Sequence, residues 1–337
     1  MIELDGAIGG GQVLRSGLSL AMVTGQALYI KNIRAKRSRP GLARQHLTAV
    51  LAAAQVCGAK VEGAELGSQT LRFEPGPIRG GDYRFTIGTA GSCTLVLQTL
   101  LPALLRAPTA SRVTICGGTH NPLAPPVDFL QRAWLPLLRR MGARIELSLN
   151  RYGFSPAGGG ELEAFIQPCE LKPLYLMQRG KLLESRAIAL SAGLPAQVGE
   201  RELKRVGQRL AFDATQLLST EIDPEQGPGN MLMLEYVHEQ VTEVFSAFGM
   251  TQVRAEKVAD QAIHQALEWR CTETAVGEHL ADQLLLPMAL AGGGRFTTPH
   301  MSEHLHSNMQ VIQRFLPVAI DSHVLEEGGL KVECRAL

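Results

Sequence analysis

The amino-acid sequence predicts an α/β protein of the α+β type, built from three repeated units of a four-stranded sheet with two helices. Two observations predict this class. The order strand, helix, strand, helix, strand, strand occurs twice in succession, each time with a glycine-rich turn before the first helix. A third copy begins near Leu174 and is interrupted by roughly 100 residues, which predicts a smaller inserted α/β domain. We therefore assign residues 1–179 and 275–337 to the domain of three repeats, and residues 180–274 to the inserted domain.

The first two units carry the clearest hydrophobic periodicity. In unit one we expect a strand at Ile2–Leu4, the turn Gly9–Gly11, a helix at Gln12–Thr24, a strand at Ala27–Ile33, a helix at Leu42–Cys57, and strands at Lys60–Val61 and Thr70–Phe73. In unit two we expect a strand at Asp82–Ile87, the turn Gly88–Gly91, a helix at Ser92–Leu105, a strand at Arg112–Cys116, a helix at Val127–Met141, and strands at Ala143–Leu149 and Glu161–Ile166.

The third unit resumes after the insertion. It is expected to contain helices at Gly277–Leu290 and Ser307–Phe315 and strands at Val318–Ile320 and Leu330–Cys334. The inserted domain has its own pattern. It predicts a strand at Arg186–Ala192, a helix at Val198–Leu210, strands at Met231–Val237 and Val241–Phe248, and a helix at Ala255–Trp269.

Composition indicates an ordinary soluble enzyme in the cytoplasm. Hydrophobic residues make up 45% of the chain, and the net charge of +1 gives no global attraction to polyanions, so a nucleic-acid site must be a local patch. The six cysteines lie far apart in sequence, which argues against zinc and disulfides and predicts reduced, buried thiols. The acidic start Met1–Asp5 is unlike a signal peptide, and apolar runs such as Leu284–Ala291 are too short to cross a membrane.

Two features of the first unit suggest anion binding. Backbone N–H groups of the turn Gly9–Gly11, at the start of the helix that carries Arg15, can approach a phosphate, although a purely structural tight turn explains the same glycines. A basic cluster follows, which predicts contacts to the phosphates of a short RNA terminus; solvated loop charges are the alternative. The cluster consists of Lys31, Arg34, Lys36, Arg37, Arg39 and Arg44, followed by Gln45 and His46.

Two segments of the third unit carry the remaining polar candidates. Asp282 and Gln283 lie near the start of a helix, where they can bind a ligand or offset the helix dipole. His300, His304 and His306 lie within seven positions just before a predicted helix. A neutral imidazole can attack phosphorus or bind a metal, so a nucleophile, a metal pair and an incidental surface cluster all remain open from these residues alone.

The chain as a whole resembles the RNA 3'-terminal phosphate cyclases, and the matching motifs run in order along nearly its full length. They are GGGQVLRSGLSL at 9–20, RPGLARQHLTAV at 39–50, GTAGSCTLVLQTLLPA at 88–103, GGTHNPLAPPVDF at 117–129, SPAGGGE at 155–161, QGPGN at 226–230, LADQLLLPMALAGGG at 280–294 and HLHSNMQVIQRFLP at 304–317.

This resemblance implies three repeats with an insertion in the third, ATP and a divalent metal (Mg²⁺ or Mn²⁺) as cofactors, and an RNA 3'-phosphate end as substrate. ATP would adenylylate His304, AMP would pass to the RNA phosphate, and the 2'-hydroxyl would displace AMP to give a 2',3'-cyclic phosphate. Residues implied to bind the nucleotide are Gln98, Pro125, His279, Leu280, Ala281, Asp282 and Gln283. We further infer that Arg15, Arg37, Gln45 and His46 hold phosphates.

The sequence departs from the family pattern at two places. The first turn of the family usually carries a glutamate and one more glycine, and that acid helps to place the metal, whereas here Ala7-Ile8-Gly9 runs straight on. His279 stands where a tyrosine often packs on the adenine. The main alternative that the resemblance implies is a noncatalytic RNA-binding or ribosome-assembly factor on the same fold, because the family includes a cyclase-like branch that lacks the nucleophile. An enolpyruvyl-type transferase is a third.

Overall fold

The computed structural model describes residues 1–7 and 9–337, and this part of the chain forms four sheets of four strands each. The first sheet has the order β1-β2-β4-β3. Its elements, in chain order, are β1 (Ile2–Asp5), α1 (Gly11–Thr24), β2 (Leu28–Lys31), α2 (Arg44–Cys57), β3 (Lys60–Glu62) and β4 (Leu71–Glu74). Gly25 and Gly58 terminate α1 and α2 in the left-handed conformation that glycine adopts without strain.

The second sheet repeats this arrangement with the order β5-β6-β8-β7. Its elements are β5 (Asp82–Thr86), α3 (Cys93–Leu104), β6 (Ser111–Gly117), α4 (Val127–Phe129), α5 (Leu135–Arg140), β7 (Arg144–Arg151) and β8 (Gly160–Gln167). The helix predicted at Val127–Met141 is present as one uninterrupted helical segment, in which a π-helical turn at Leu130–Trp134 lies between α4 and α5. Pro136 follows this turn and has no N–H to donate to the carbonyl four residues earlier.

The third sheet has the order β15-β16-β14-β9. Its elements are β9 (Leu174–Leu176), α8 (Glu278–Leu290), β14 (Gly293–Thr298), α9 (Glu303–Phe315), β15 (Val318–Val324) and β16 (Leu330–Ala336). In each of these three sheets the first strand pairs in parallel with the second, and the fourth lies between the second and third. The predicted mixed α/β class is thus confirmed, and the three similar sheets are consistent with the predicted repeats.

The fourth sheet lies between β9 and α8 in the chain and has the order β11-β10-β12-β13. Its elements are β10 (Leu182–Ala192), α6 (Gln197–Leu210), β11 (Leu217–Ile222), β12 (Gly229–His238), β13 (Thr242–Phe248) and α7 (Ala255–Arg270). Strand β11 was absent from the sequence prediction because it is an edge strand with mostly exposed residues, so it lacks hydrophobic alternation. The domain boundaries at residues 180 and 274 stay a prediction.

Arg179 joins the two places where the chain enters and leaves this fourth sheet. Its guanidinium lies 4.3 Å from the centre of the Trp269 ring, and it donates to the carbonyl oxygens of Trp269 and Thr272. Residue 179 precedes β10 and residue 272 follows α7. One buried cation therefore joins the segment that enters the fourth sheet to the segment that leaves it.

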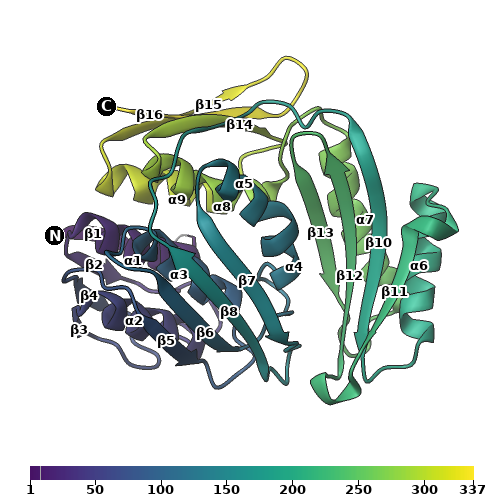
Figure 1. Cartoon of the computed structure of the whole chain (residues 1–337), viewed down its shortest axis with the longest axis horizontal. Coiled ribbons are helices and arrows are strands. Elements are labelled where there is room, and N and C mark those ends of the chain that lie inside the picture. Colours follow the sequence, from purple (N-terminus) through teal and green to yellow (C-terminus); the bar gives the residue numbers. More distant parts are fainter. Residues whose placement is uncertain (8) are drawn as a thin grey trace.

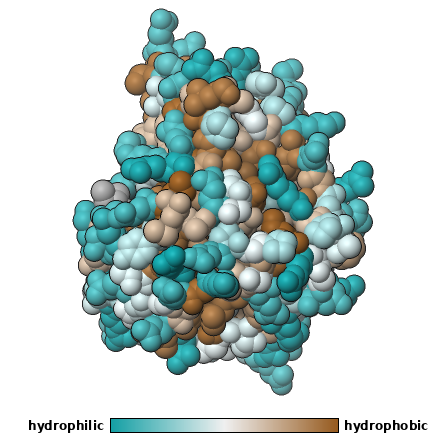
Figure 2. All heavy atoms as spheres, turned by 90° about the vertical axis from the view of Figure 1, so that its left-hand side faces the viewer, coloured by the Kyte–Doolittle hydropathy of each residue, from teal (hydrophilic) through white to brown (hydrophobic). Residues whose placement is uncertain are grey.

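Helices fill the space between the sheets. Figure 1 shows α1, α3, α8 and α9 in the middle of the molecule, between the first sheet and the third, while α6 and α7 cover the fourth sheet. One large apolar core extends through the first three sheets, and a second core lies within the fourth, around Tyr236 and Trp269. On the side seen in Figure 2, hydrophilic residues cover much of the surface, with hydrophobic ones between them.

The cysteines are free thiols, but fewer of them are buried than the sequence predicted. Cys57, Cys93 and Cys334 are buried, Cys116 and Cys169 are half-buried, and Cys271 is exposed in the turn after α7. Among the described helices, none has the length and apolar character needed to cross a membrane.

Candidate active site

His304 lies in the first turn of α9, exposed to solvent. The helix begins four residues earlier than the predicted Ser307, because the Ser302 hydroxyl caps it by accepting a 2.8 Å hydrogen bond from the N–H of Leu305. His304 and His306 are therefore helical and point in different directions, so the metal pair that an extended segment would allow does not form. His306 instead contacts Gln310, one turn on, at 3.1 Å.

Asp282 of α8 is tied to the start of α9. Its Oδ1 accepts a 2.6 Å hydrogen bond from Ser302, and its side chain is almost fully buried. Burial raises the pKa of Asp282 to about 7, with a further rise from the charge of Glu278, while the hydrogen bonds from Ser302 and Leu305 act in the opposite direction. This carboxyl group thus holds or releases a proton near neutral pH.

The glycine turn of the first unit lies against α9 and the basic residues. A Cβ on Gly9 would be 2.7 Å from the Ser307 hydroxyl, and one on Gly11 would be 2.5 Å from Nε2 of His46 and 2.8 Å from Nη1 of Arg15. Glycine is required here because side chains from three elements occupy the space where a Cβ would lie. The turn, Arg15, His46 and the segment after His304 therefore form one site.

Arg37 and His46 complete the basic side of this site. The Arg37 guanidinium is 3.6 Å from the Cβ position of Gly10. Burial lowers the pKa of His46 to about 3, helped by the charges of Arg15, Arg34 and Arg37, so its ring is neutral, and its Nδ1 is buried without a hydrogen-bond partner. Burial also lowers the pKa of Arg15, to about 10, which leaves the guanidinium positive at neutral pH.

The electrostatic surroundings of His304 favour a neutral ring. Partial desolvation by the surrounding protein lowers the pKa of His304, and the nearby charges of Arg15, His279 and Arg37 lower it further, while Glu278 opposes them. A neutral imidazole with a free lone pair, next to cations that attract phosphate, is suited to attack an electrophilic phosphorus.

Other predicted site residues have structural partners. Gln45 accepts a 2.8 Å hydrogen bond from the N–H of Ser92 at the start of α3, so its carbonyl oxygen is occupied. Gln98 of α3 donates to the side chain of Gln283 on α8, which joins two predicted nucleotide-binding residues 185 positions apart. Pro125 lies half-buried, and its carbonyl accepts a 2.7 Å hydrogen bond from Thr94.

The residues of α8 that are predicted to bind the nucleotide differ in their exposure to solvent. His279 is exposed, whereas Leu280 and Ala281 are fully buried, so their side chains belong to the core. Leu280 and Ala281 can therefore contact a ligand only if their surroundings open, and His279, Asp282 and Gln283 carry the polar chemistry of this segment.

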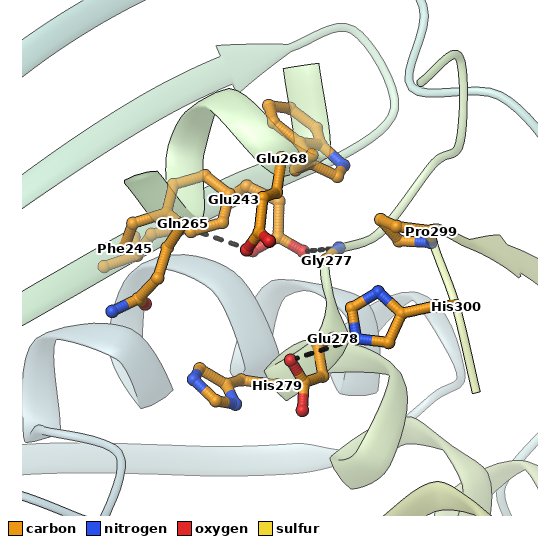
Figure 3. A pocket seen from close by; sticks show the side chains of 11 residues that line it. Glu243, Phe245, Gln265, Glu268, Gly277, Glu278, His279, Pro299 and His300 are labelled. Atoms are coloured by element: carbon orange, nitrogen blue, oxygen red, sulfur yellow. Dashed lines mark hydrogen bonds and ion pairs between the residues drawn. The ribbon is translucent and has the colours of Figure 1, made fainter. Parts of the chain in front are cut away.

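A candidate metal site was not predicted from the sequence. Glu278, His279 and Asp282 each place a ligand atom within 4.8 Å of the others. Figure 3 shows the Glu278 carboxylate beside His279 and His300, and its Oε2 lies 3.3 Å from Nε2 of His300. Their positions i, i+1 and i+4 on one helix are a usable signal, since residues four apart share a face.

The pocket in Figure 3 extends from these residues to the fourth sheet. Glu243 of β13 lines it, and its Oε1 accepts a 2.6 Å hydrogen bond from the N–H of Gly277. Burial raises the pKa of Glu243 to about 8, although the N–H groups of Gly277 and Val244 favour its ionised form. Glu243 was not predicted from the sequence, because it comes from a different sheet.

Comparisons with known proteins agree with this arrangement. A family model described as RNA 3'-terminal phosphate cyclase matches residues 7–322. A protein of Pseudomonas fluorescens named RNA 3'-terminal phosphate cyclase is 71% identical over all of this chain and 98% of its own length. One of the same name from Ectopseudomonas mendocina is 61% identical over 99% of this chain and 98% of its own length.

A likeness to a solved structure is weak. The enolpyruvyl transferase NikO from Streptomyces tendae is 11% identical over 98% of this chain and 47% of its own, with a TM-score of 0.36, which supports no argument about function. The matched range and the identities of the two relatives, which extend through the glycine turn, the basic loop and the histidine segment, show that the chain belongs to the RNA 3'-terminal phosphate cyclase family.

Proposed function

We propose that this chain catalyses the ATP-dependent conversion of an RNA 3'-terminal phosphate to a 2',3'-cyclic phosphodiester, as a ligase-type enzyme of RNA processing. Membership of the cyclase family supports the overall reaction. The observation that carries the mechanism is the exposed, neutral imidazole of His304 beside the cations Arg15 and Arg37. Because both substrates are found inside cells, we also propose a cytoplasmic location.

In the first step, an imidazole nitrogen of His304 attacks the α-phosphorus of ATP. A nitrogen–phosphorus bond forms, the bond from the α-phosphorus to the bridging oxygen breaks, and pyrophosphate leaves. The lowered pKa of His304 supports this step, because only the neutral ring has a free lone pair.

In the second step, an oxygen of the RNA 3'-phosphate attacks the AMP phosphorus and the nitrogen–phosphorus bond breaks. His304 returns to its free form, and the RNA end becomes an adenylate. In the third step, the 2'-hydroxyl attacks the 3'-phosphorus, loses its proton to solvent, and releases AMP to give the cyclic product.

The residues around His304 have distinct proposed roles. Arg15 and Arg37 bind phosphate oxygens of ATP or RNA, and the open Gly9–Gly11 turn gives those oxygens access to backbone N–H groups. Gln98, Pro125, His279, Asp282 and Gln283 form the nucleotide side of the site. For His46 we retain a role at the phosphates, which its neutral ring can fulfil as a hydrogen-bond donor. Gln45 can contribute only its amide N–H groups.

The family also implies a divalent metal, and the donor set at Glu278, His279 and Asp282 fits one. Two carboxylates with an imidazole suit Mn²⁺ better than Mg²⁺, which prefers oxygen ligands alone. When bound, such an ion supplies positive charge to the phosphates of ATP. We propose these residues as its site in this chain, where the usual loop glutamate is missing.

The rival proposal is a noncatalytic factor on the same fold. His304 argues against it, because a protein that only binds RNA has no need for an exposed, neutral histidine at the phosphate site. An enolpyruvyl transferase is a weaker alternative, since such an enzyme needs no nucleophilic histidine.

The test is incubation of the full chain with ATP labelled at the α-phosphate, in the presence of Mg²⁺ or Mn²⁺. We expect protein-bound AMP that survives alkali but not acid, and that is absent from His304→Ala. His306→Ala is the matched control, because His306 is exposed on the same helix turn and its ring is hydrogen-bonded to the neighbouring Gln310. Label that persists in His304→Ala would place the nucleophile elsewhere.

A second assay separates the enzyme from the binding factor. RNA with a labelled 3'-phosphate should gain a phosphatase-resistant cyclic end, whereas RNA ending in a 3'-hydroxyl should remain unchanged. Binding of both RNAs without any change at their ends would support the noncatalytic factor.

A further inference from the structure

A buried hydrogen bond connects two helices on either side of the site. The Ser16 hydroxyl on α1 donates to Oδ1 of Asn308 on α9 at 2.7 Å, across 292 residues of sequence. Each of these residues is only 2% exposed. Because no water competes for such a buried bond, its geometry constrains how the two helices lie against each other.

Asn308 uses both ends of its amide. While Oδ1 accepts from Ser16, Nδ2 donates to the backbone carbonyl of Asp282 on α8 at 3.1 Å. Rotating the amide by half a turn would direct Oδ1 at that carbonyl and lose the bond, so the orientation is defined by its partners. One side chain thereby joins α1, α8 and α9.

The connection continues along α1 to the phosphate-binding cation. Gln12 donates to Oγ of Ser16 at 3.2 Å, and Arg15 donates to Oε1 of Gln12 at 2.8 Å. An unbroken series of side-chain hydrogen bonds therefore leads from the guanidinium of Arg15 to the amide of Asn308.

Asn308 lies one turn after His304 on the same face of α9. A shift of α9 against α1 therefore moves His304 relative to Arg15 by a similar distance. Displacement of a reacting group by about 1 Å can reduce a rate by about 100-fold. Apolar contacts between the same helices stabilise them without fixing this spacing, because hydrophobic attraction has no direction.

We propose that Ser16 and Asn308 are positioning residues for the transfer of AMP to His304, which they hold at a fixed place relative to Arg15. This proposal rests on the proposed role of His304 as nucleophile. It predicts that loss of the bond slows chemistry and leaves the binding of ATP nearly unchanged.

The experiment compares Ser16→Ala and Asn308→Asp with Ser19→Ala in the full-length protein. Ser19 is the matched control because it is a buried serine on the same helix, but its hydroxyl donates to the carbonyls of Arg15 and Thr99 instead of α9. Ser16→Thr keeps a hydroxyl at the bridging position. Three quantities are measured: thermal stability, the dissociation constant for ATP, and the single-turnover rate of protein labelling.

We expect Ser16→Ala and Asn308→Asp to label about 10- to 100-fold more slowly than the wild type. Their ATP dissociation constants should stay within about threefold, which is under 1 kcal/mol. Ser19→Ala should lose similar stability yet keep the wild-type rate, and Ser16→Thr should recover most of it. If Asn308→Asp fails to fold, the serine variants alone decide the question.

Two results would overturn the proposal: labelling of Ser16→Ala as fast as that of Ser19→Ala, or a loss confined to the affinity for ATP. Either is distinct from failure of the proposed function, in which the wild type would take no label or His304→Ala would keep it.

Discussion

The hydroxyl of Ser302 donates a 2.6 Å hydrogen bond to Oδ1 of Asp282 and at the same time accepts the N–H of Leu305. One side chain thus caps the helix that carries His304 and fixes that cap to α8. The start of α9 is therefore set by a neighbouring helix as well as by its own sequence, which places His304, the proposed nucleophile, beside the residues proposed to bind the nucleotide.

Removing the Ser302 hydroxyl should change both the pKa of Asp282 and the stability of α9. In Ser302→Ala, we expect the pKa of Asp282 to rise further, because the hydrogen bond that favours its ionised form is lost. Loss of the cap should cost about 1 kcal/mol of unfolding free energy. Carbon NMR titration of the carboxyl group and urea unfolding measure the two effects. Ser92→Ala, which removes the cap of α3, is the control that should lose stability without changing Asp282.

The acid limb of the pH–rate profile for AMP transfer should report the protonation state of His304. Since desolvation and nearby positive charges lower its pKa below the ordinary 6.5, labelling should persist at pH values where a free histidine is largely protonated. In Arg37→Ala one of these charges is absent, so the limb should move to higher pH. The measurement is the single-turnover rate against pH at saturating ATP; an unchanged limb in the variant would show that Arg37 does not act on this ring.

Replacing Gly11 should disturb the site without unfolding the protein. In Gly11→Ala the new Cβ must displace His46 and Arg15, whose side-chain ends lie within 3 Å of it. We expect AMP transfer to fall at least about tenfold, in line with a small misplacement of binding groups. Gly25→Ala is the counterpart, because its Cβ meets open space and only backbone strain, about 1 kcal/mol, is added. Equal activities in the two variants would contradict our account of the turn.

Metal binding at α8 can be measured without ATP. Electron paramagnetic resonance titration with Mn²⁺ should show one site that weakens about 10-fold or more in Glu278→Gln, because a charged ligand is lost. Glu303→Gln is matched to it, as an exposed carboxylate in the first turn of α9. Mg²⁺ should compete poorly for the site. If both variants bind Mn²⁺ like the wild type, the metal is not held by this cluster.

A buried acid in the fourth sheet's domain should make stability depend on pH. Burial raises the pKa of Glu202 from 4.5 to about 7, against the effect of its hydrogen bond from Asn230. The folded state then holds a proton that the unfolded state has released, so stability falls as pH rises from 4.5 to about 7. The loss is roughly 1.4 kcal/mol for each pH unit, or about 3 kcal/mol at most.

Glu202→Gln removes this titration while keeping the shape of the side chain. We expect the variant and the wild type to be similarly stable at pH 4, and the variant to be the more stable of the two at pH 8. Urea unfolding at both values tests this, and a difference that is the same at each pH would exclude Glu202 as its source.

The sequence predicted the fold well because its units repeat. Each unit has a glycine-containing turn followed by a helical periodicity, so the bounds of α1, α3 and α8 could be predicted to within a few residues. Local rules failed where a distant segment decides the structure. The start of α9 depends on Asp282 of another helix, and edge strand β11 is defined by pairing with β10 instead of by its own pattern.

The site was predictable only in part for the same reason. Resemblance and charge pointed to His304, Arg15 and Arg37, which the structure brings together around the Gly9–Gly11 turn. The link from Ser16 to Asn308 could not be predicted, because a serine and an asparagine 292 positions apart carry no signal of pairing. Glu243 was missed likewise, since only packing of β13 against the start of α8 gives it a partner in Gly277.

The contacts of Arg179 with Trp269 and Thr272 have an evolutionary consequence. Because the polypeptide leaves for the fourth sheet and returns from it at neighbouring positions, the segment in between is an insertion whose two ends adjoin. Such an insertion can lengthen, shorten or be exchanged among descendants while the strand pairing of the other three sheets stays unchanged.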